Sequence, residues 1–306
     1  MSKYLALAVL SAAFTLSAQT RPDWAFLTPD KQQPPASEES GPIHIPGSSK
    51  EYTAAQIDDL SNPPDWFPDE HGPAPSIIQH GKGAALACGA CHLMSAHGHQ
   101  ESADLAGLNA EYIVRTMNDF KNGTRIDPAR MNAIAKAMSD EDIKQAADWF
   151  AAMKPGGWVK VVETDTVPKS YVSVKGRQRL PLPGGGMEPL GNRVVELPQD
   201  VARAISRDPH SGFIAYVPVG SLAKGATLVK TGGGKSIACA VCHGDSLEGL
   251  GDVPRIAGLH PAYVARQLFA FQTGSNHSVS SALMKKVVAN LTADDILAIA
   301  AYAAAQ

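Results

Sequence analysis

The 306-residue chain has few cysteines, few aromatic residues and almost no net charge. Four cysteines are too few for a disulfide-dense scaffold of this length. A formal charge of −3, from 27 basic and 30 acidic residues, leaves no electrostatic footprint for nucleic acid. Aromatic residues make up only 6%, whereas 27 glycines and 22 prolines indicate long irregular connections. The hydrophobic fraction of 44% is that of a globular protein, which excludes a wholly disordered or collagen-like chain.

An apolar run stands at the N-terminus. Lys3 precedes an apolar stretch from Tyr4 to about Leu16, and small residues and a polar break follow. This order predicts a secretory signal peptide over residues 1–18. The run is shorter than the ~20 residues that a membrane-spanning helix needs. A buried N-terminal helix and an uncleaved anchor are the alternatives. We therefore expect a periplasmic protein, free or peripheral to the inner membrane, with no membrane span after cleavage.

Two long segments are predicted to be irregular. The N-terminal extension, residues 19–75, holds 11 of the 22 prolines and cannot form long helices. It is either a disordered leader or a segment that packs on the folded body through scattered aromatic residues: Trp24, Phe26, Trp66 and Phe67. The linker, residues 155–220, contains one β-like run at 158–167 and a flexible patch at 184–186. A connection of this length is rarely without a role.

An internal repeat occupies the rest of the chain. A shift of 151 residues aligns these pairs: Cys88 with Cys239, Cys91 with Cys242, His92 with His243, Gly107 with Gly258, Tyr112 with Tyr263, Arg115 with Arg266, Phe120 with Phe271 and Gly123 with Gly274. Two residues inserted in the second copy change the offset to 153, which aligns Met131 with Met284. Because chance does not keep one register over so many positions, we predict two copies of one module. They span residues 76–154 and 221–306, in agreement with the two domains that the length suggests.

Both modules are predicted to be helical. Apolar residues recur at helical spacing in each: Leu108, Tyr112, Ile113, Met117 and Phe120, and then Leu259, Tyr263, Val264, Leu268 and Phe271. Asn109 suits a helix N-cap, and Pro261 stands where a first helical residue is expected. Ser139 and Thr292 each begin a capping-box pattern that opens the last helix of its module.

All four cysteines occur in Cys-x-x-Cys-His motifs: Cys88, Cys91 and His92 in the first module, and Cys239, Cys242 and His243 in the second. In this spacing the two thiols form thioethers to the vinyl groups of a haem, and the histidine binds its iron. The sequence therefore predicts two covalently bound haem c groups. Zinc sites would need cysteine pairs much closer together, and a thioredoxin-like redox pair would need a βαβ context. Disulfides within each pair would leave the two histidines unexplained.

The repeat also predicts the second axial ligand of each iron. Met284 is the only methionine after His243, and its partner under the 153-residue offset is Met131. The first module offers four competitors without such a counterpart: Met94, Met117, Met138 and Met153. The alternative is that Met131 and Met284 are core residues. Ligation by histidine and methionine fills both axial positions, which favours electron transfer over the binding of small molecules.

His97 and His99, which follow the first motif and have no counterpart in the second module, are expected at the surface rather than in a metal site. His80, His210 and His277 are expected at the surface or beside a haem edge. Arg115 and Arg266 recur on the same helix and either pair with haem propionates or lie on a solvated face.

These residues give the chain a resemblance to bacterial two-haem c-type cytochromes with two class I cytochrome c modules. The shared pattern is Cys-x-x-Cys-His, then Ala-Gly-Leu, a Tyr and a Phe-x-x-Gly helix, then an axial Met and a Ser/Thr-Asp-rich helix start. The resemblance implies an all-α fold of two cytochrome c-like domains, with long irregular N-terminal and inter-domain segments. It also implies a periplasmic electron carrier that serves a redox protein donor and acceptor: a dehydrogenase, a reductase or an oxidase. The protein is then not an enzyme itself.

Two other functions remain open. A haem enzyme, either a two-haem peroxidase or a sulfur-compound dehydrogenase, would need an exchangeable iron site. Met131 and Met284 together would deny a peroxidase that site, and no cysteine is left to ligate a catalytic haem. An obligate electron-transfer subunit of a larger dehydrogenase or oxidase complex would differ only in having a permanent partner.

Overall fold

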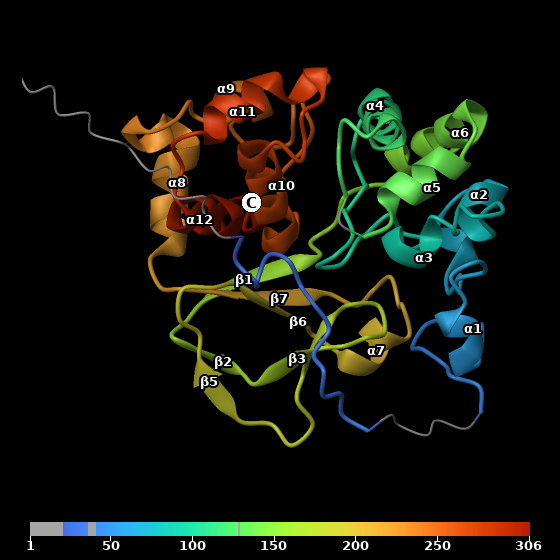
Figure 1. The fold of residues 1–306 in the computed structure, drawn as a ribbon. Helices are drawn as coiled ribbons and strands as arrows, with labels where there is room; N and C mark the ends of the chain where they lie inside the picture. The colour runs from blue at the N-terminus through green and yellow to red at the C-terminus, as the bar shows by residue number, and fades with distance from the viewer. Residues whose placement is uncertain (1–20, 36–40, 128) are drawn as a thin grey trace, which may run out of the picture.

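The computed structural model describes residues 21–35, 41–127 and 129–306, so the predicted signal peptide lies outside the described residues. Two groups of helices lie side by side, and a layer of strands lies against both of them (Figure 1). We call the helices α2–α6 the first module and the helices α8–α12 the second module. Two short helices stand outside them: α1 (Ala54–Asp58) and α7 (Val201–Ile205).

The helices of the two modules correspond in order. Those of the first module are α2 (Ser76–Gln79), α3 (Gly89–His92), α4 (Ala110–Asn122), α5 (Met131–Ala137) and α6 (Asp140–Ala151). Those of the second module are α8 (Ser221–Thr231), α9 (Ala240–His243), α10 (Pro261–Thr273), α11 (Ala282–Val288) and α12 (Ala293–Ala304).

Local sequence signals set where these helices begin and end. The Asn109 side chain accepts a hydrogen bond from the backbone N–H of Glu111 at the start of α4, and Pro261 is the first residue of α10. Both helices end at a left-handed glycine, Gly123 with φ 77° and Gly274 with φ 75°. Complete capping boxes open α6 and α12. The predicted helices and caps are therefore confirmed.

Each module has its own apolar core. In the first module, Ile143 and Phe150 of α6 are almost fully buried against α2 and α4. In the second module, Phe269 of α10 and Ile296 of α12 occupy a corresponding core. The all-α prediction therefore holds for both modules.

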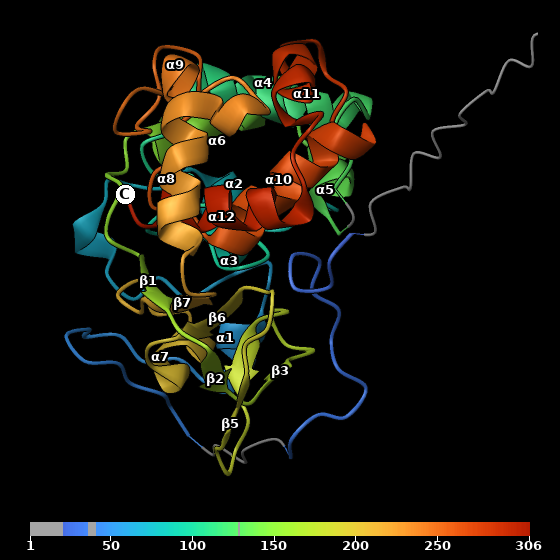
Figure 2. The ribbon, with the colours of Figure 1, turned by 90° about the vertical axis from the view of Figure 1, so that its left-hand side faces the viewer.

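The linker is not irregular, because it folds into strands. They are β1 (Val159–Glu163), β2 (Thr166–Pro168), β3 (Ser170–Val172), β4 (Arg179–Pro181), β5 (Met187–Pro189), β6 (Val195–Pro198) and β7 (Phe213–Val217). The central sheet has the order β1-β7-β6, with β1 parallel and β6 antiparallel to β7, while β2 pairs with β5 and β3 with β4. Figure 2 shows this layer below the helices. The all-α prediction is wrong for this segment, because its β-branched side chains are buried between the strands and helix α12.

The N-terminal extension packs on the body. Trp24 and Phe26 contact the core of the second module, and Ala25 is fully buried there. Farther along, the Trp66 ring nitrogen donates to the carbonyl of Ser206, next to α7, at 2.7 Å. Of the two alternatives for this extension, packing through its aromatic residues is the one observed in its described part.

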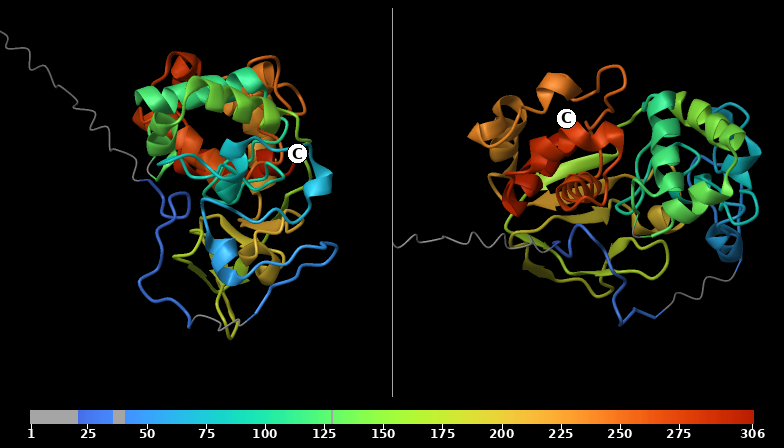
Figure 3. Two further views of the ribbon diagram at one scale, coloured as in Figure 1. Left: turned by 90° about the vertical axis from the view of Figure 1, so that its right-hand side faces the viewer. Right: turned by 45° about the horizontal axis from the view of Figure 1, so that its top comes forward.

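An approximate two-fold axis relates the modules, which lie side by side in Figure 3. Residues 124–126 pair with residues 275–277, their equivalents under the 151-residue shift, and Arg125 and Asn276 form an antiparallel bridge. Backbone hydrogen bonds of 2.8 and 2.9 Å flank this bridge. Antiparallel pairing of a segment with its own equivalent is the result expected at a two-fold axis.

The arginines that recur in the repeat make reciprocal ion pairs across this axis. Arg115 of α4 contacts Asp252 at 3.2 Å, and Arg266 of α10 contacts Glu101 at 3.0 Å. Glu101 and Asp252 are themselves equivalent under the shift. Neither arginine therefore lies on a simple solvated face, because each binds a carboxylate of the opposite module.

No single helix of residues 21–35, 41–127 and 129–306 is both long and apolar enough to cross a bilayer. Two neighbouring segments, Val279–Val288 and Ala293–Ala304, meet the length and composition requirement only as a pair, bent by 114°.

Gly225 sits in the middle of α8 where this helix packs on α12. A Cβ atom there would overlap the carbonyl oxygen of Ala298 and lie 2.6 Å from the Cβ of Tyr302. We expect Gly225→Ala to lower the free energy of unfolding by about 1–3 kcal/mol through overpacking, against the ~1 kcal/mol by which alanine favours a helix. Guanidinium unfolding followed by circular dichroism measures this. The control is Ala223→Gly at an exposed position of α8, and a Gly225→Ala protein as stable as the parent would contradict the packing argument.

Candidate haem sites

Each module presents its motif histidine in the same way. His92 is the last residue of α3 and His243 the last residue of α9. The Nδ1 atom of His92 lies 2.7 Å from the carbonyl oxygen of Ala103, and Nδ1 of His243 lies 2.8 Å from that of Pro254. A hydrogen bond donated by Nδ1 fixes the ring and leaves Nε2 as the atom that can bind a metal.

The loop that supplies this carbonyl has the same backbone path in both modules. The N–H of Leu105 donates to Ala96 at 2.8 Å, and the N–H of Ile256, its equivalent, donates to Leu247 at 2.9 Å. Ala96 and Leu247 both adopt positive φ, at 65° and 60°. Two non-glycine residues held in the same disfavoured conformation indicate that the loop has the same role in both copies, which is to place a carbonyl oxygen at Nδ1 of the motif histidine.

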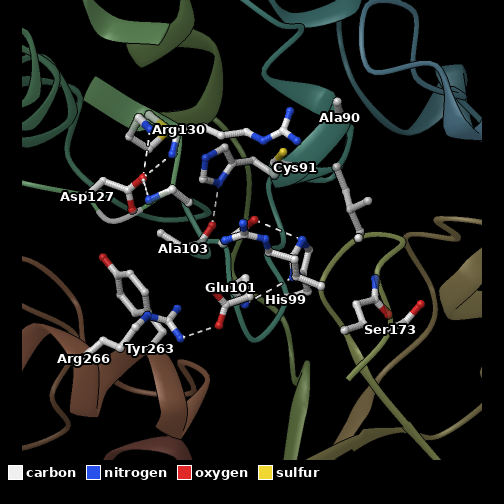
Figure 4. A pocket seen from close by; sticks show the side chains of 18 of the residues that line it. Ala90, Cys91, His99, Glu101, Ala103, Asp127, Arg130, Ser173, Tyr263 and Arg266 are labelled. Atoms are coloured by element: carbon white, nitrogen blue, oxygen red, sulfur yellow. Dashed lines mark hydrogen bonds and ion pairs between the residues drawn. The ribbon is translucent and has the colours of Figure 1, made fainter. Parts of the chain in front are cut away.

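A cavity of about 720 Å³ opens beside His92. Cys91, His92 and Met131 line it together with apolar residues of α4: Tyr112, Ile113, Met117 and Phe120. Side chains of the linker complete its wall, including Ser173, which Figure 4 shows opposite the helices. This size and this largely apolar lining are those of a cofactor pocket, so the residues present fit a haem.

Three of the four motif thiols are buried in a way that disfavours the thiolate form. Burial raises the pKa of Cys88 to about 12 and that of Cys239 to about 11. Burial also raises the pKa of Cys91. A thioredoxin-like pair needs a lowered thiol pKa, so this alternative has no support here. The thiol groups suit covalent attachment, which removes the ionisable proton.

Burial likewise lowers the pKa of both motif histidines, His92 and His243. The neutral imidazole is the form that binds a metal. Within the described part of the chain no three His, Cys, Asp or Glu side chains form a cluster able to hold a metal ion. The zinc alternative therefore has no site there.

The methionines of the first module separate into two groups. Met94 and Met138 are buried in the core, and Met153 packs against it. Met117 and Met131 line the cavity. The repeat alone distinguishes these two, because a leucine replaces Met117 in the second module.

A side-chain clamp positions Met131 at the first turn of α5. One carboxylate oxygen of Asp127 accepts from the backbone N–H groups of Ala129, Arg130 and Met131 at 2.5–3.0 Å. In the second module, Met284 is half-buried in α11 and packs against the core that also contacts Cys239. A short 3₁₀ turn, Val279–Ser281, precedes α11 there and accounts for part of the local difference between the copies.

The other histidines divide between surface and interior. His80, His210 and His277 are exposed, as expected. His99 lines the cavity, its Nε2 lies 3.0 Å from the Ser102 hydroxyl, and burial lowers its pKa well below the ordinary value.

His97 stacks on Trp158 with ring centroids 4.7 Å apart. The surface prediction is wrong for His97 and His99, because the linker covers this part of the first module.

Sequence reasoning missed three features of the site. The carbonyls of Ala103 and Pro254 carry no side-chain signal, and only their common distance of 11 residues from the motif histidine marks them. The clamp of Asp127 has no counterpart in the repeat. Arg125 also lines the cavity, but Asn276 replaces it in the second module.

Comparison with known proteins identifies relatives over most of the chain, although no family model matches it. Cytochrome c4 from Pseudomonas aeruginosa is 25% identical over 228 residues, which is 72% of this chain and 85% of that protein. A thiosulfate dehydrogenase electron acceptor from Stutzerimonas stutzeri is 25% identical over 222 residues, 72% of this chain and 78% of that protein.

Among solved structures, a thiosulfate dehydrogenase from Marichromatium purpuratum superposes with a TM-score of 0.52 and 26% identity. The match covers 76% of this chain but only 39% of that longer one. The relatives by sequence are thus named as a cytochrome c4 and as an electron acceptor, and the solved structure is that of a thiosulfate dehydrogenase. Together with the doubled motif and the matching histidine geometry, they make this chain a two-haem c-type cytochrome with two class I cytochrome c modules, which carries two covalent haem c groups and transfers electrons.

Proposed function

We propose that the protein is a periplasmic carrier that takes electrons from a dehydrogenase and delivers them to a second redox protein. Cys88 and Cys91 would attach the first haem, and His92 and Met131 would ligate its iron. The second haem is attached and ligated by the equivalent residues: Cys239, Cys242, His243 and Met284. The observation that carries this proposal is the identical histidine-to-carbonyl geometry of the two modules, with Met131 in the same cavity as His92.

The chain's own residues decide what each site can do. A bound haem supplies a one-electron couple at its iron. The carbonyls of Ala103 and Pro254 hold the imidazoles of His92 and His243 in the tautomer whose Nε2 is free. The thioethers of Met131 and Met284 would supply the second ligand of each iron, which would leave no coordination position for a substrate or water. The apolar side chains of α4 exclude water from the first site. These features support outer-sphere electron transfer.

The names of the relatives support a dehydrogenase as the electron donor. Two of them are electron acceptors of thiosulfate dehydrogenase. We infer that the donor of this chain is a dehydrogenase of the same kind, which oxidises a small reduced sulfur compound. Such redox encounters bury a small area, typically less than roughly 1,200 Å². The predicted signal peptide supports the periplasm as the compartment in which they occur.

A redox titration followed by optical spectra tests the proposed function. The exported full-length protein is expected to show two low-spin haems with a methionine-to-iron absorption band and two one-electron steps. Mixing the oxidised protein with thiosulfate and a thiosulfate dehydrogenase is expected to reduce both haems. A high-spin spectrum at rest, or turnover of peroxide, would favour the enzyme alternative.

A further inference from the structure

Charged groups at the module interface occur almost entirely in compensated pairs. The reciprocal pairs of Arg115 and Arg266 are one example. A second lies on the axis itself, where Arg255 contacts its own equivalent Asp104 at 3.3 Å. Both of these side chains are buried. Because water does not reach them, each charge is neutralised by the other.

Arg125 is the exception. Its residue is 8% exposed, and its guanidinium donates to the side-chain oxygen of Gln267 at 2.6 Å and to the Tyr263 hydroxyl at 3.4 Å. The guanidinium also lies over the ring of Phe120, 4.7 Å from its centroid. These partners are all neutral, and no carboxylate within residues 21–35, 41–127 and 129–306 forms an ion pair with it. A buried cation with neutral partners is costly unless an anion reaches it.

An anion that compensates Arg125 would fit in the cavity beside His92. Arg125 lines the same cavity as His92 and Met131, and Tyr263 and Gln267 line it too. Figure 4 shows Tyr263 and Arg266 at the side of this cavity where the second module closes it. Arg266 is already paired with Glu101 there, as the dashed line marks. Of the two buried arginines in the described residues that line this cavity, Arg125 is therefore the one without a carboxylate partner, while the less buried Arg130, Arg177 and Arg207 line it as well.

The second module has no such charge. Asn276 occupies the equivalent position, and its side-chain oxygen accepts a hydrogen bond from the Ser278 hydroxyl at 3.1 Å. The two-fold symmetry of the interface is thus broken by one buried positive charge on the side of the first module.

We propose that Arg125 binds a propionate carboxylate of the first haem and raises the reduction potential of that haem relative to a protein without this charge. Reduction adds one electron to the iron and makes or breaks no bond of Arg125, so the effect is Coulombic. A nearby cation stabilises the state with the extra electron. The inference rests on the proposed assignment of the His92 cavity to the first haem.

Three variants of the full-length holoprotein test this role: Arg125→Gln, Arg125→Lys and Asn276→Arg. In the Gln variant we expect one of the two potentials to fall by about 59 mV, which corresponds to a tenfold loss of electron affinity. The Lys variant keeps the charge and is expected to recover most of this loss. Asn276→Arg is expected to raise the other potential.

The outcomes separate a charge effect from a structural one. A Lys variant as low as the Gln variant, or unchanged potentials in both, would overturn the proposal. An equal fall of both potentials would also overturn it, because Arg125 would then not belong to one haem. Haem count and the methionine-to-iron band are measured in each variant. Their persistence shows that the proposed function stands even where the role of Arg125 fails.

Discussion

Replacing Cys239 and Cys242 together by serine is expected to yield a protein that carries one covalent haem instead of two. The chain has four cysteines, and all of them belong to the two motifs, so no other thiol can take over the attachment. Intact-protein mass after periplasmic expression measures the number of haems directly. The double substitution of Cys88 and Cys91 is expected to give the same loss.

A matched control lies inside the second motif. Val241 stands between the two cysteines, is 69% exposed and provides no attachment atom. Val241→Ala is therefore expected to retain both haems. A cysteine-free second motif that still gave the mass of two haems would contradict the attachment proposal, and so would a parent protein with only one.

Met131→Ala is expected to remove the methionine-to-iron band of one haem and to lower its potential. Loss of the thioether withdraws the ligand that raises the potential. Since axial ligands cover a range of about 0.8 V, a fall on the order of 0.1 V or more is expected. Met284→Ala is expected to act in the same way on the other haem.

Met117→Ala is the control that shows whether Met131 or Met117 is the iron ligand. Met117 lines the same cavity as Met131 and has the same chemistry, but it has no methionine counterpart in the second module. We expect this variant to keep the band and to shift the potential only slightly. If it loses the band while the Met131 variant keeps it, the ligand is Met117, and the repeat is a poor guide to the iron site.

Local signals explain which parts of the fold were predictable. Asn109, Pro261 and the two capping boxes act on helix ends within a few residues of themselves, and the structure has each helix start where the sequence predicts it. The linker behaves differently. Its central sheet pairs β1 with β7 in parallel, for example Val161 with Ala215. No local pattern encodes a partner so distant in sequence, and the valine-rich run predicted only that part of the linker was β-like.

The haem sites likewise combine features that local sequence predicts with features that it does not. The two motifs are compact patterns with a covalent logic, so the sequence alone indicates their chemistry. The acceptor carbonyls of Ala103 and Pro254 are backbone groups, which any residue type provides. Arg125 was not predictable from the repeat for a different reason, because the two copies differ at this position, where the second has Asn276. Its burial and its neutral partners become visible only when the modules are brought together.

The contact between the modules is of the kind that two separate, identical chains make when they form a symmetric homodimer. Equivalent segments pair with each other, the ion pair of Arg115 and Asp252 recurs as Arg266 and Glu101 with the roles exchanged, and Arg255 pairs with its own equivalent, Asp104. Such a contact does not depend on how its halves are joined. A tandem gene fusion of an ancestral dimer would therefore preserve it, and the joining peptide would be free to acquire a fold of its own, as residues 155–220 have done.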